Sequence, residues 1–124
     1  MKTLASKHRL VLKLPPSVNH CYGNRRGGGR FLKPEAVAWK EESALRLKMC
    51  RIKPYKPTDK VVVEVLVTWP DTLRRDCDNL AKLTQDAIQQ SGIIEDDRYL
   101  LWRVMDWKVN PALAGLEITL YKKD

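Results

Sequence analysis

A cluster of polar side chains near the middle of the chain has types and spacing suited to holding a cation. Asp76 and Asp78 are two residues apart, Asn79 follows directly, and Lys82 comes four residues after Asp78. On extended chain, residues i and i+2 point the same way, so both carboxylates can share one ion. Lys82 lies about one helical turn beyond Asp78 and is expected to face the same place.

A third carboxylate, Asp97, follows in the segment "EDDR" and could return the chain to this cluster. Three carboxylates with open positions for water and phosphate suit Mg²⁺ or Mn²⁺. Such a site can polarise a phosphodiester and lower the pKa of a bound water, while Lys82 could neutralise charge on the phosphoryl oxygens. A structural alternative stays open, because Asp76 and Asp78 could simply cap a helix and residues 95–97 could form a solvated turn.

The charge distribution favours a polyanionic partner. Residues 71–97 contain seven acids and three basic residues, a net charge of −4, whereas the whole chain carries +8. The remainder therefore carries +12, which is typical of a surface that binds DNA or RNA. Candidate phosphate contacts are the arginines of "NRRGGGRF" and the pair before the first acid: Arg25, Arg26, Arg30, Arg74 and Arg75. Arginine pairs with phosphate through its planar fork, although a basic, solvated loop with no ligand remains the alternative.

Other residue types exclude several classes of protein. Three cysteines without CxxC spacing and only two histidines argue against a disulfide framework and a zinc site. Apolar runs are too short to span a membrane, and the N-terminal residues lack the apolar stretch of a signal peptide, so we expect a cytoplasmic protein. Cys77 is expected to be a buried spacer rather than a nucleophile. Three tryptophans in strand patterns are expected in the core: Trp69, Trp102 and Trp107.

Hydrophobic periodicity predicts a small α/β (α+β) domain with a mixed sheet, two main helices and the approximate order β-α-β-α-β-β. The strands are expected at 9–14, 60–69, 99–109 and 115–123, and the helices at about 35–51 and 78–92. The run "KVVVEVLVTW" has apolar residues on both faces, which predicts a central strand. The apolar phase of 99–109 shifts near Met105. In the first helix, Ala36, Trp39, Leu45 and Met49 are expected to face the core.

Three segments together resemble the RusA family of Holliday-junction resolvases, small endonucleases often carried by prophages. "PPSVNHCYGNRRGGGRF" is similar to that family's N-terminal segment, "RRDCDNLAKLTQDAI" to its central Asp-x-Asp-Asn signature, and "GIIEDDRYL" to its Asp-Asp segment. The resemblance extends from about residue 10 to 120. It implies a single RusA-like endonuclease domain over 1–124, with a flexible basic loop at about 20–33.

The resemblance also implies roles for individual residues. It assigns the catalytic, metal-binding acids to Asp76, Asp78 and Asp97, with Lys82 as the essential base, and leaves Asp96 and Asn79 without a settled role. Its implied cofactor is Mg²⁺, with Mn²⁺ as a substitute and no small-molecule organic cofactor. The implied partners are a four-way DNA junction and a second copy of the chain, since two symmetric nicks in DNA recombination and repair need two sites related by a two-fold axis.

Two other functions stay open on the sequence alone. One is a Mg²⁺-dependent nuclease that acts on flaps or single strands. The other is a non-catalytic, basic nucleic-acid-binding module whose acids only cap a helix. Substitution of Asp78 by Asn separates the second from an endonuclease, because it should stop cutting but spare binding.

Overall fold

Four strands and two helices form the body of the protein. The computed structural model describes residues 6–16 and 22–124. In chain order the elements are β1 (His8–Leu12), β2 (Tyr22–Asn24), β3 (Arg30–Leu32), α2 (Pro34–Met49), β4 (Val61–Trp69), the 3₁₀ turn η1 (Cys77–Leu80), α3 (Ala81–Gln90), η2 (Asp97–Tyr99), β5 (Leu100–Val109), η3 (Pro111–Leu113) and β6 (Gly115–Lys122). The mixed sheet with two main helices predicted from the sequence is confirmed. No helix in the described part of the chain is long and apolar enough to cross a membrane.

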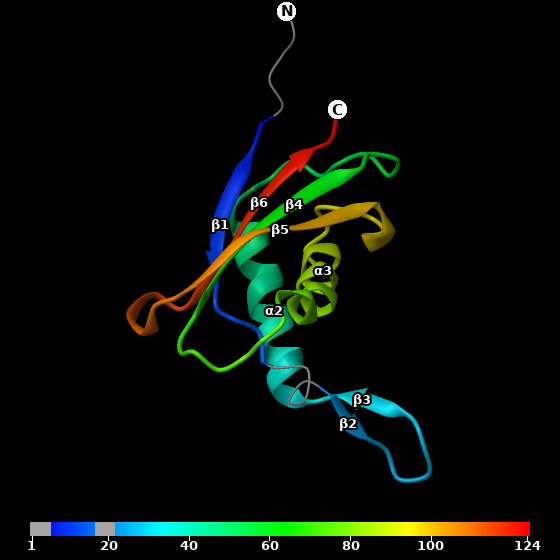
Figure 1. Cartoon of the computed structure of the whole chain (residues 1–124). Helices are drawn as coiled ribbons and strands as arrows, with labels where there is room; N and C mark the ends of the chain where they lie inside the picture. The colour runs from blue at the N-terminus through cyan, green and yellow to red at the C-terminus, as the bar shows by residue number, and fades with distance from the viewer. Residues whose placement is uncertain (1–5, 17–21) are drawn as a thin grey trace, which may run out of the picture.

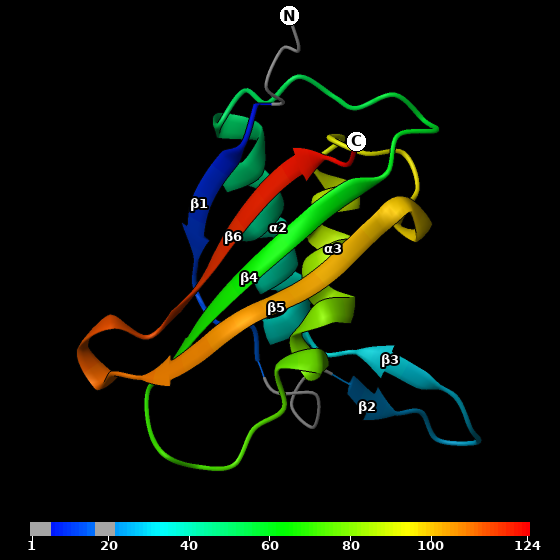
Figure 2. The same ribbon diagram turned by 45° about the horizontal axis from the view of Figure 1, so that its top comes forward.

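The main sheet has the strand order β1-β6-β4-β5, with β4 as a central strand (Figure 2). β6 pairs antiparallel with both β1 and β4, whereas β4 and β5 are parallel. Alternate residues of β4 face the helices, and Val62 on the opposite side is also fully buried. The apolar run of β4 thus fits a strand with neighbours on both sides, as predicted.

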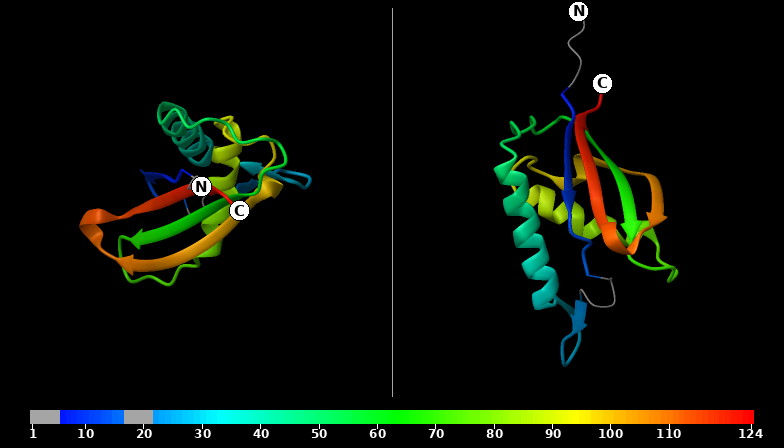
Figure 3. Two further views of the ribbon diagram at one scale, coloured as in Figure 1. Left: turned by 90° about the horizontal axis from the view of Figure 1, so that it is seen from above. Right: turned by 90° about the vertical axis from the view of Figure 1, so that its left-hand side faces the viewer.

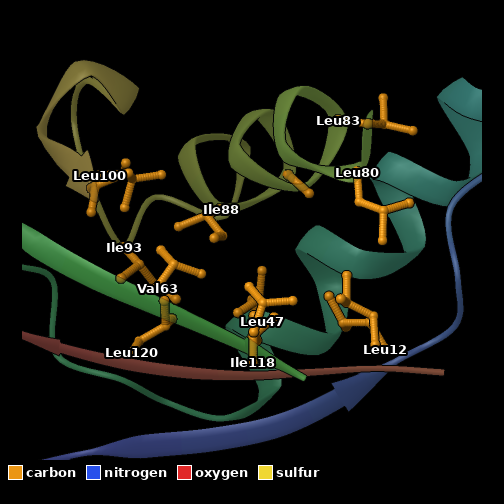
Figure 4. Packing of buried hydrophobic residues seen from close by; sticks show 14 of the residues in the cluster. Leu12, Leu47, Val63, Leu80, Leu83, Ile88, Ile93, Leu100, Ile118 and Leu120 are labelled. Atoms are coloured by element: carbon orange, nitrogen blue, oxygen red, sulfur yellow. The ribbon is translucent and has the colours of Figure 1, made fainter. Parts of the chain in front are cut away.

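Both helices cover the same face of the sheet (Figure 3). α3 connects the parallel strands β4 and β5, a crossover that normally carries a helix. The hydrophobic core lies between this helical layer and the sheet (Figure 4). Its largest fully buried side chains are Leu12, Leu47, Ile88, Leu116, Ile118 and Leu120.

The buried face of α2 differs from the one expected. Leu45 and Met49 are 58% and 72% exposed, so their assignment to the core is wrong, whereas Ala36 and Trp39 are buried as predicted. The buried stripe continues through Ser43, Ala44 and Leu47. Leu45 is six positions after Trp39, which at 100° per residue turns it about 120° away from Trp39, on the side opposite to Ser43 and Leu47.

The apolar phase shift in β5 corresponds to a β-bulge. Residues up to Val104 pair with β4 in one register, and from Asp106 onward the register is shifted by one residue. Met105 is therefore the extra residue of the bulge. As a result Trp107, which pairs with Val67, again lies on the helix-facing side of the sheet.

The basic loop expected at about 20–33 is in large part a hairpin. β2 and β3 pair antiparallel and project beyond the start of α2 (Figure 1), while residues 20 and 21 lie outside the described part. Gly27, Gly28 and Gly29 all have positive φ, between 88° and 109°, which only glycine adopts without strain. Gly23 lies under the Phe31 ring, where a Cβ would come within 2.7 Å of Cε1. The glycines therefore determine the shape of this hairpin.

Candidate active site

An open groove lies at the carboxyl ends of the two parallel strands. This is the usual position of ligand sites in sheets with parallel strands. The groove has a volume of about 1160 Å³ and is lined from β4 and β5 by Trp69, Val104 and Trp107. The segment between β4 and α3 contributes its polar and charged residues: Arg74, Arg75, Asp76, Asp78 and Asn79. The structure thus brings five of the residues that the sequence singled out to one concave surface.

Asp76 lies at the start of the 3₁₀ turn η1, which leads into α3, and its side chain is exposed. Its Oδ1 accepts a hydrogen bond from the Asp78 backbone N–H at 3.0 Å, and its backbone O accepts one from the Asn79 N–H at 3.1 Å. Asp76 is therefore the N-cap of η1, as the structural alternative anticipated. The carboxylate of Asp78 lies one residue inside the turn and is exposed. Capping uses one oxygen of Asp76, which leaves the second oxygen and the Asp78 carboxylate available to a cation.

Lys82 is in the first turn of α3 and is directed along the helix. Its Nζ lies 3.3 Å from Oδ1 of Asp86, an i,i+4 ion pair on an exposed face. Such pairs contribute only about 0.3–0.5 kcal/mol to stability. Lys82 follows Asp78 by about one turn but does not line the groove that Asp76 and Asp78 share, and its catalytic role remains a prediction.

Asp97 lies at the other end of the parallel strand pair from Asp76 and Asp78. It belongs to η2, immediately before β5 begins, whereas Asp76 and Asp78 line the groove together with Val104 and Trp107, from the middle and the carboxyl half of β5. With a rise of about 3.3 Å per residue, Leu100 and Val104 alone are about 13 Å apart along β5. Oxygen ligands of Mg²⁺ lie about 2.1 Å from the ion, so two of them stand at most about 4 Å apart.

The three acids therefore do not meet within one chain. Among residues 6–16 and 22–124, no group of three or more Asp, Glu, His or Cys side chains is arranged to hold a metal ion. The expected convergence of Asp76, Asp78 and Asp97 is wrong for a single subunit, because α3 and β5 separate the pair from the third acid. Asp96 caps η2 through a hydrogen bond from the Arg98 N–H to its Oδ1 at 3.0 Å, as Asp76 caps η1.

Arg75 is fixed at the side of the groove. Its guanidinium forms a two-point ion pair with Asp71, with Nη2 3.1 Å from Oδ2, and lies 5.3 Å from the centre of the Trp69 ring. The Arg75 hydrogen bond holds the pKa of Asp71 below its usual value. Arg74 is exposed on the same loop. These contacts orient a basic edge beside the acids, and Asp71, for which the sequence pattern gave no role, is one of the residues that fix it.

Cys77 is half-buried between the two acids. Burial raises the pKa of its thiol, and the negative charges of Asp76 and Asp78 raise it further. The thiol is therefore protonated at neutral pH and a poor nucleophile, in agreement with its predicted role as a spacer.

The other predicted phosphate contacts are on the hairpin. Arg25, Arg26 and Arg30 are exposed there, and Arg25 closes its turn through a backbone hydrogen bond from its N–H to the Gly29 carbonyl at 2.8 Å. The structure places these arginines at the tip of a projecting arm rather than in the wall of the groove (Figure 1). Their role in DNA binding remains a prediction.

Comparison with known proteins assigns the chain to a family. The family profile of endodeoxyribonuclease RusA matches residues 13–121. A curated protein of Enterobacteria phage 82, named crossover junction endodeoxyribonuclease rusA, is 32% identical over 119 residues, which cover 91% of this chain and 92% of the relative. The equally named protein of Escherichia coli strain K12 has the same identity and coverage, and that of Enterobacteria phage HK97 is 26% identical over 92% of this chain and 95% of the relative. On this agreement along nearly its whole length, the chain belongs to the RusA family of endodeoxyribonucleases.

Proposed function

We propose that the protein is a crossover junction endodeoxyribonuclease, which cuts the phosphodiester backbone of four-way DNA junctions. The observation that carries this proposal is the family match over residues 13–121, together with relatives of that printed name along more than nine tenths of the chain. The groove supports it, because two exposed carboxylates and two arginines line one open surface. The basic remainder of the chain is suited to binding the rest of a large polyanion.

We propose further that Asp76 and Asp78 hold a Mg²⁺ ion, for which Mn²⁺ could substitute. Their oxygens are the hard donors that Mg²⁺ prefers, and Mg²⁺ commonly binds one or two carboxylates together with water and substrate phosphate. When bound, the ion would supply Lewis acidity and an activated water. Lys82 would then release Asp86 and neutralise charge on a phosphoryl oxygen, and Arg74 and Arg75 would position the backbone of the cut strand.

The position of Asp97 supports a dimeric active form. Two symmetric nicks require two sites related by a two-fold axis, and in an isologous dimer residue i of one copy meets residue j of the other. Asp97 cannot reach an ion held by Asp76 and Asp78 of its own chain. We propose that it serves the site of the other subunit in a homodimer, where a two-fold axis can bring the opposite ends of β5 together.

Cleavage assays with synthetic DNA of defined shape test the proposed function. We expect cutting of a labelled four-way junction with Mg²⁺, at two symmetric positions, and no cutting with EDTA. Linear duplex, flap and single-stranded DNA of the same sequence serve as matched substrates. Faster cutting of flaps or single strands than of junctions would assign the protein to a different nuclease activity.

A binding measurement separates chemistry from recognition. The Asp78→Asn variant removes one negative charge beside the DNA, so it should abolish cutting while junction affinity stays equal or increases. If the folded variant still cuts at the wild-type rate, Asp78 has no part in the chemistry and the acids only cap the helix.

A further inference from the structure

Trp107 is an exposed tryptophan on the side of the sheet that otherwise faces the core. Its β4 partner, Val67, is 1% exposed, whereas Trp107 is 59% exposed. The carboxyl end of β5 extends beyond both helices (Figure 2), and the groove opens beside Trp107. The expectation that Trp107 belongs to the core is therefore wrong, and the ring presents a large apolar surface to solvent beside the two acids.

The surroundings of this ring combine charged and apolar side chains. Arg74, Arg75, Asp76 and Asp78 line the same groove. Trp69 lies on the same face of the sheet but is buried beneath Arg75. Trp107 therefore provides the accessible aromatic face of a groove that also carries two arginines, two carboxylates and apolar side chains such as Leu73.

We propose that Trp107 stacks on an unpaired nucleobase of the strand that is cut, at the branch point of the junction. This inference rests on the proposed function. A nucleotide combines a planar apolar base with an anionic phosphate, and the groove combines an aromatic ring with arginines.

Stacking of a base on Trp107 would strengthen DNA binding substantially, and it would do so for any of the four bases. Every base has a π-face, and stacking on an aromatic side chain strengthens nucleic-acid binding by roughly tenfold per base. Bases at a branch point have an incomplete stack, so less free energy is needed to extrude them than from continuous duplex. Trp107 would thus favour branched over linear DNA and hold the strand with its phosphate near Asp76 and Asp78.

Affinity measurements with abasic junctions test the inference. Junctions that lack one base at each position flanking the branch point in turn are titrated in EDTA, which prevents cutting, against wild type and Trp107→Ala. At one position we expect base removal to weaken wild-type binding by roughly tenfold but to leave Trp107→Ala nearly unaffected, because the stacking partner is already absent. Trp107→Phe should keep most of the wild-type response. Met105→Ala is the matched control, since Met105 is 56% exposed on the same strand but does not line the groove.

Two results would overturn the inference. One is equal sensitivity of wild type and Trp107→Ala to base removal at every position. The other is dissociation of a wild-type dimer by Trp107→Ala in sedimentation velocity, which would make the ring part of a subunit contact. Either result leaves the proposed function intact if the wild type cuts the intact junction with Mg²⁺, whereas failure of that cutting in the wild type refutes the proposed function itself.

Discussion

Mixing two inactive variants can reveal whether the active site is shared between subunits. Asp76→Asn removes a carboxylate that lines the groove. Asp97→Asn removes the carboxylate in η2, just before β5 begins. If each site takes Asp76 and Asp78 from one subunit and Asp97 from the other, a mixed dimer contains one site with both substitutions and one site with neither. Each variant alone should be inactive, and the mixture should recover activity.

The expected recovery follows from the separation in the structure. Leu100 and Val104 alone are about 13 Å apart along β5, several times the roughly 4 Å that separates oxygens on one Mg²⁺. If subunits exchange freely in an equal mixture, about half of the dimers are mixed and about one quarter of the wild-type number of sites is intact. Because each mixed dimer has only one such site, the products should be single nicks rather than paired cuts.

The assay uses a junction labelled on each strand in turn. The two variants are mixed, incubated long enough for subunit exchange, and given Mg²⁺; products are separated on denaturing gels for nicks and on native gels for resolved duplexes. The matched control mixes Asp76→Asn with Asp78→Asn, which alter the same half-site, so activity should stay absent. If the first mixture remains inactive although sedimentation shows mixed dimers, then Asp97 does not complete the partner's site.

Three further predictions follow from single contacts. With EDTA present and the other cysteines replaced by serine, Asp78→Asn should lower the pH at which iodoacetamide alkylates Cys77, because one of the charges that raise its pKa is gone; an unchanged pH profile would contradict this. Leu47→Ala should lower the free energy of unfolding by about 2–5 kcal/mol in urea titrations, whereas Leu45→Ala should change it by less than about 0.5 kcal/mol, and similar losses for both would contradict the observed buried face of α2. Gly23→Ala should displace the aromatic ring across the β2–β3 hairpin and weaken junction binding measured by fluorescence anisotropy, with an unchanged melting temperature; wild-type affinity would show that this arm does not contact DNA.

Local patterns in the sequence predict most of the sheet because alternation directly reports which residues are buried. β4 and β6 have strict alternation on the helix-facing side, and the phase shift near Met105 predicts an irregularity that the structure shows as a bulge. In α2 the helical spacing of apolar residues gave a wrong buried face, because Ser43 is buried and Leu45 is exposed. The prediction assumed that apolar side chains lie in the core and polar ones at the surface, and these two residues do the opposite.

The candidate site was predicted in part for a similar reason. Asp76 and Asp78 lie two residues apart, so local geometry alone brings them to one groove, whereas Lys82, four residues further on, does not line it. Asp97 depends on the path of α3 and β5, which spacing in the sequence does not reveal. The exposure of Trp107 depends on where the helices end over the sheet, a property of packing between distant segments. A tryptophan just after a phase shift was the one sequence signal for it.

Asp76 can be both a helix cap and a metal ligand, the two roles that the sequence left open. The need for its negative charge can therefore be tested without unfolding η1. The cap uses one carboxylate oxygen, which accepts the Asp78 N–H at 3.0 Å. Asparagine is an equally good N-cap, since its amide oxygen accepts the same bond, while its amide nitrogen cannot ligate a cation. Asp76→Asn should therefore preserve η1 and the melting temperature without added metal, yet lose the stabilisation that Mg²⁺ gives to the wild type. Asp76→Ala, which removes both functions, should in addition destabilise the fold by about 1 kcal/mol. Equal stabilisation of the wild type and Asp76→Asn by Mg²⁺ would mean that the carboxylate serves only as a cap.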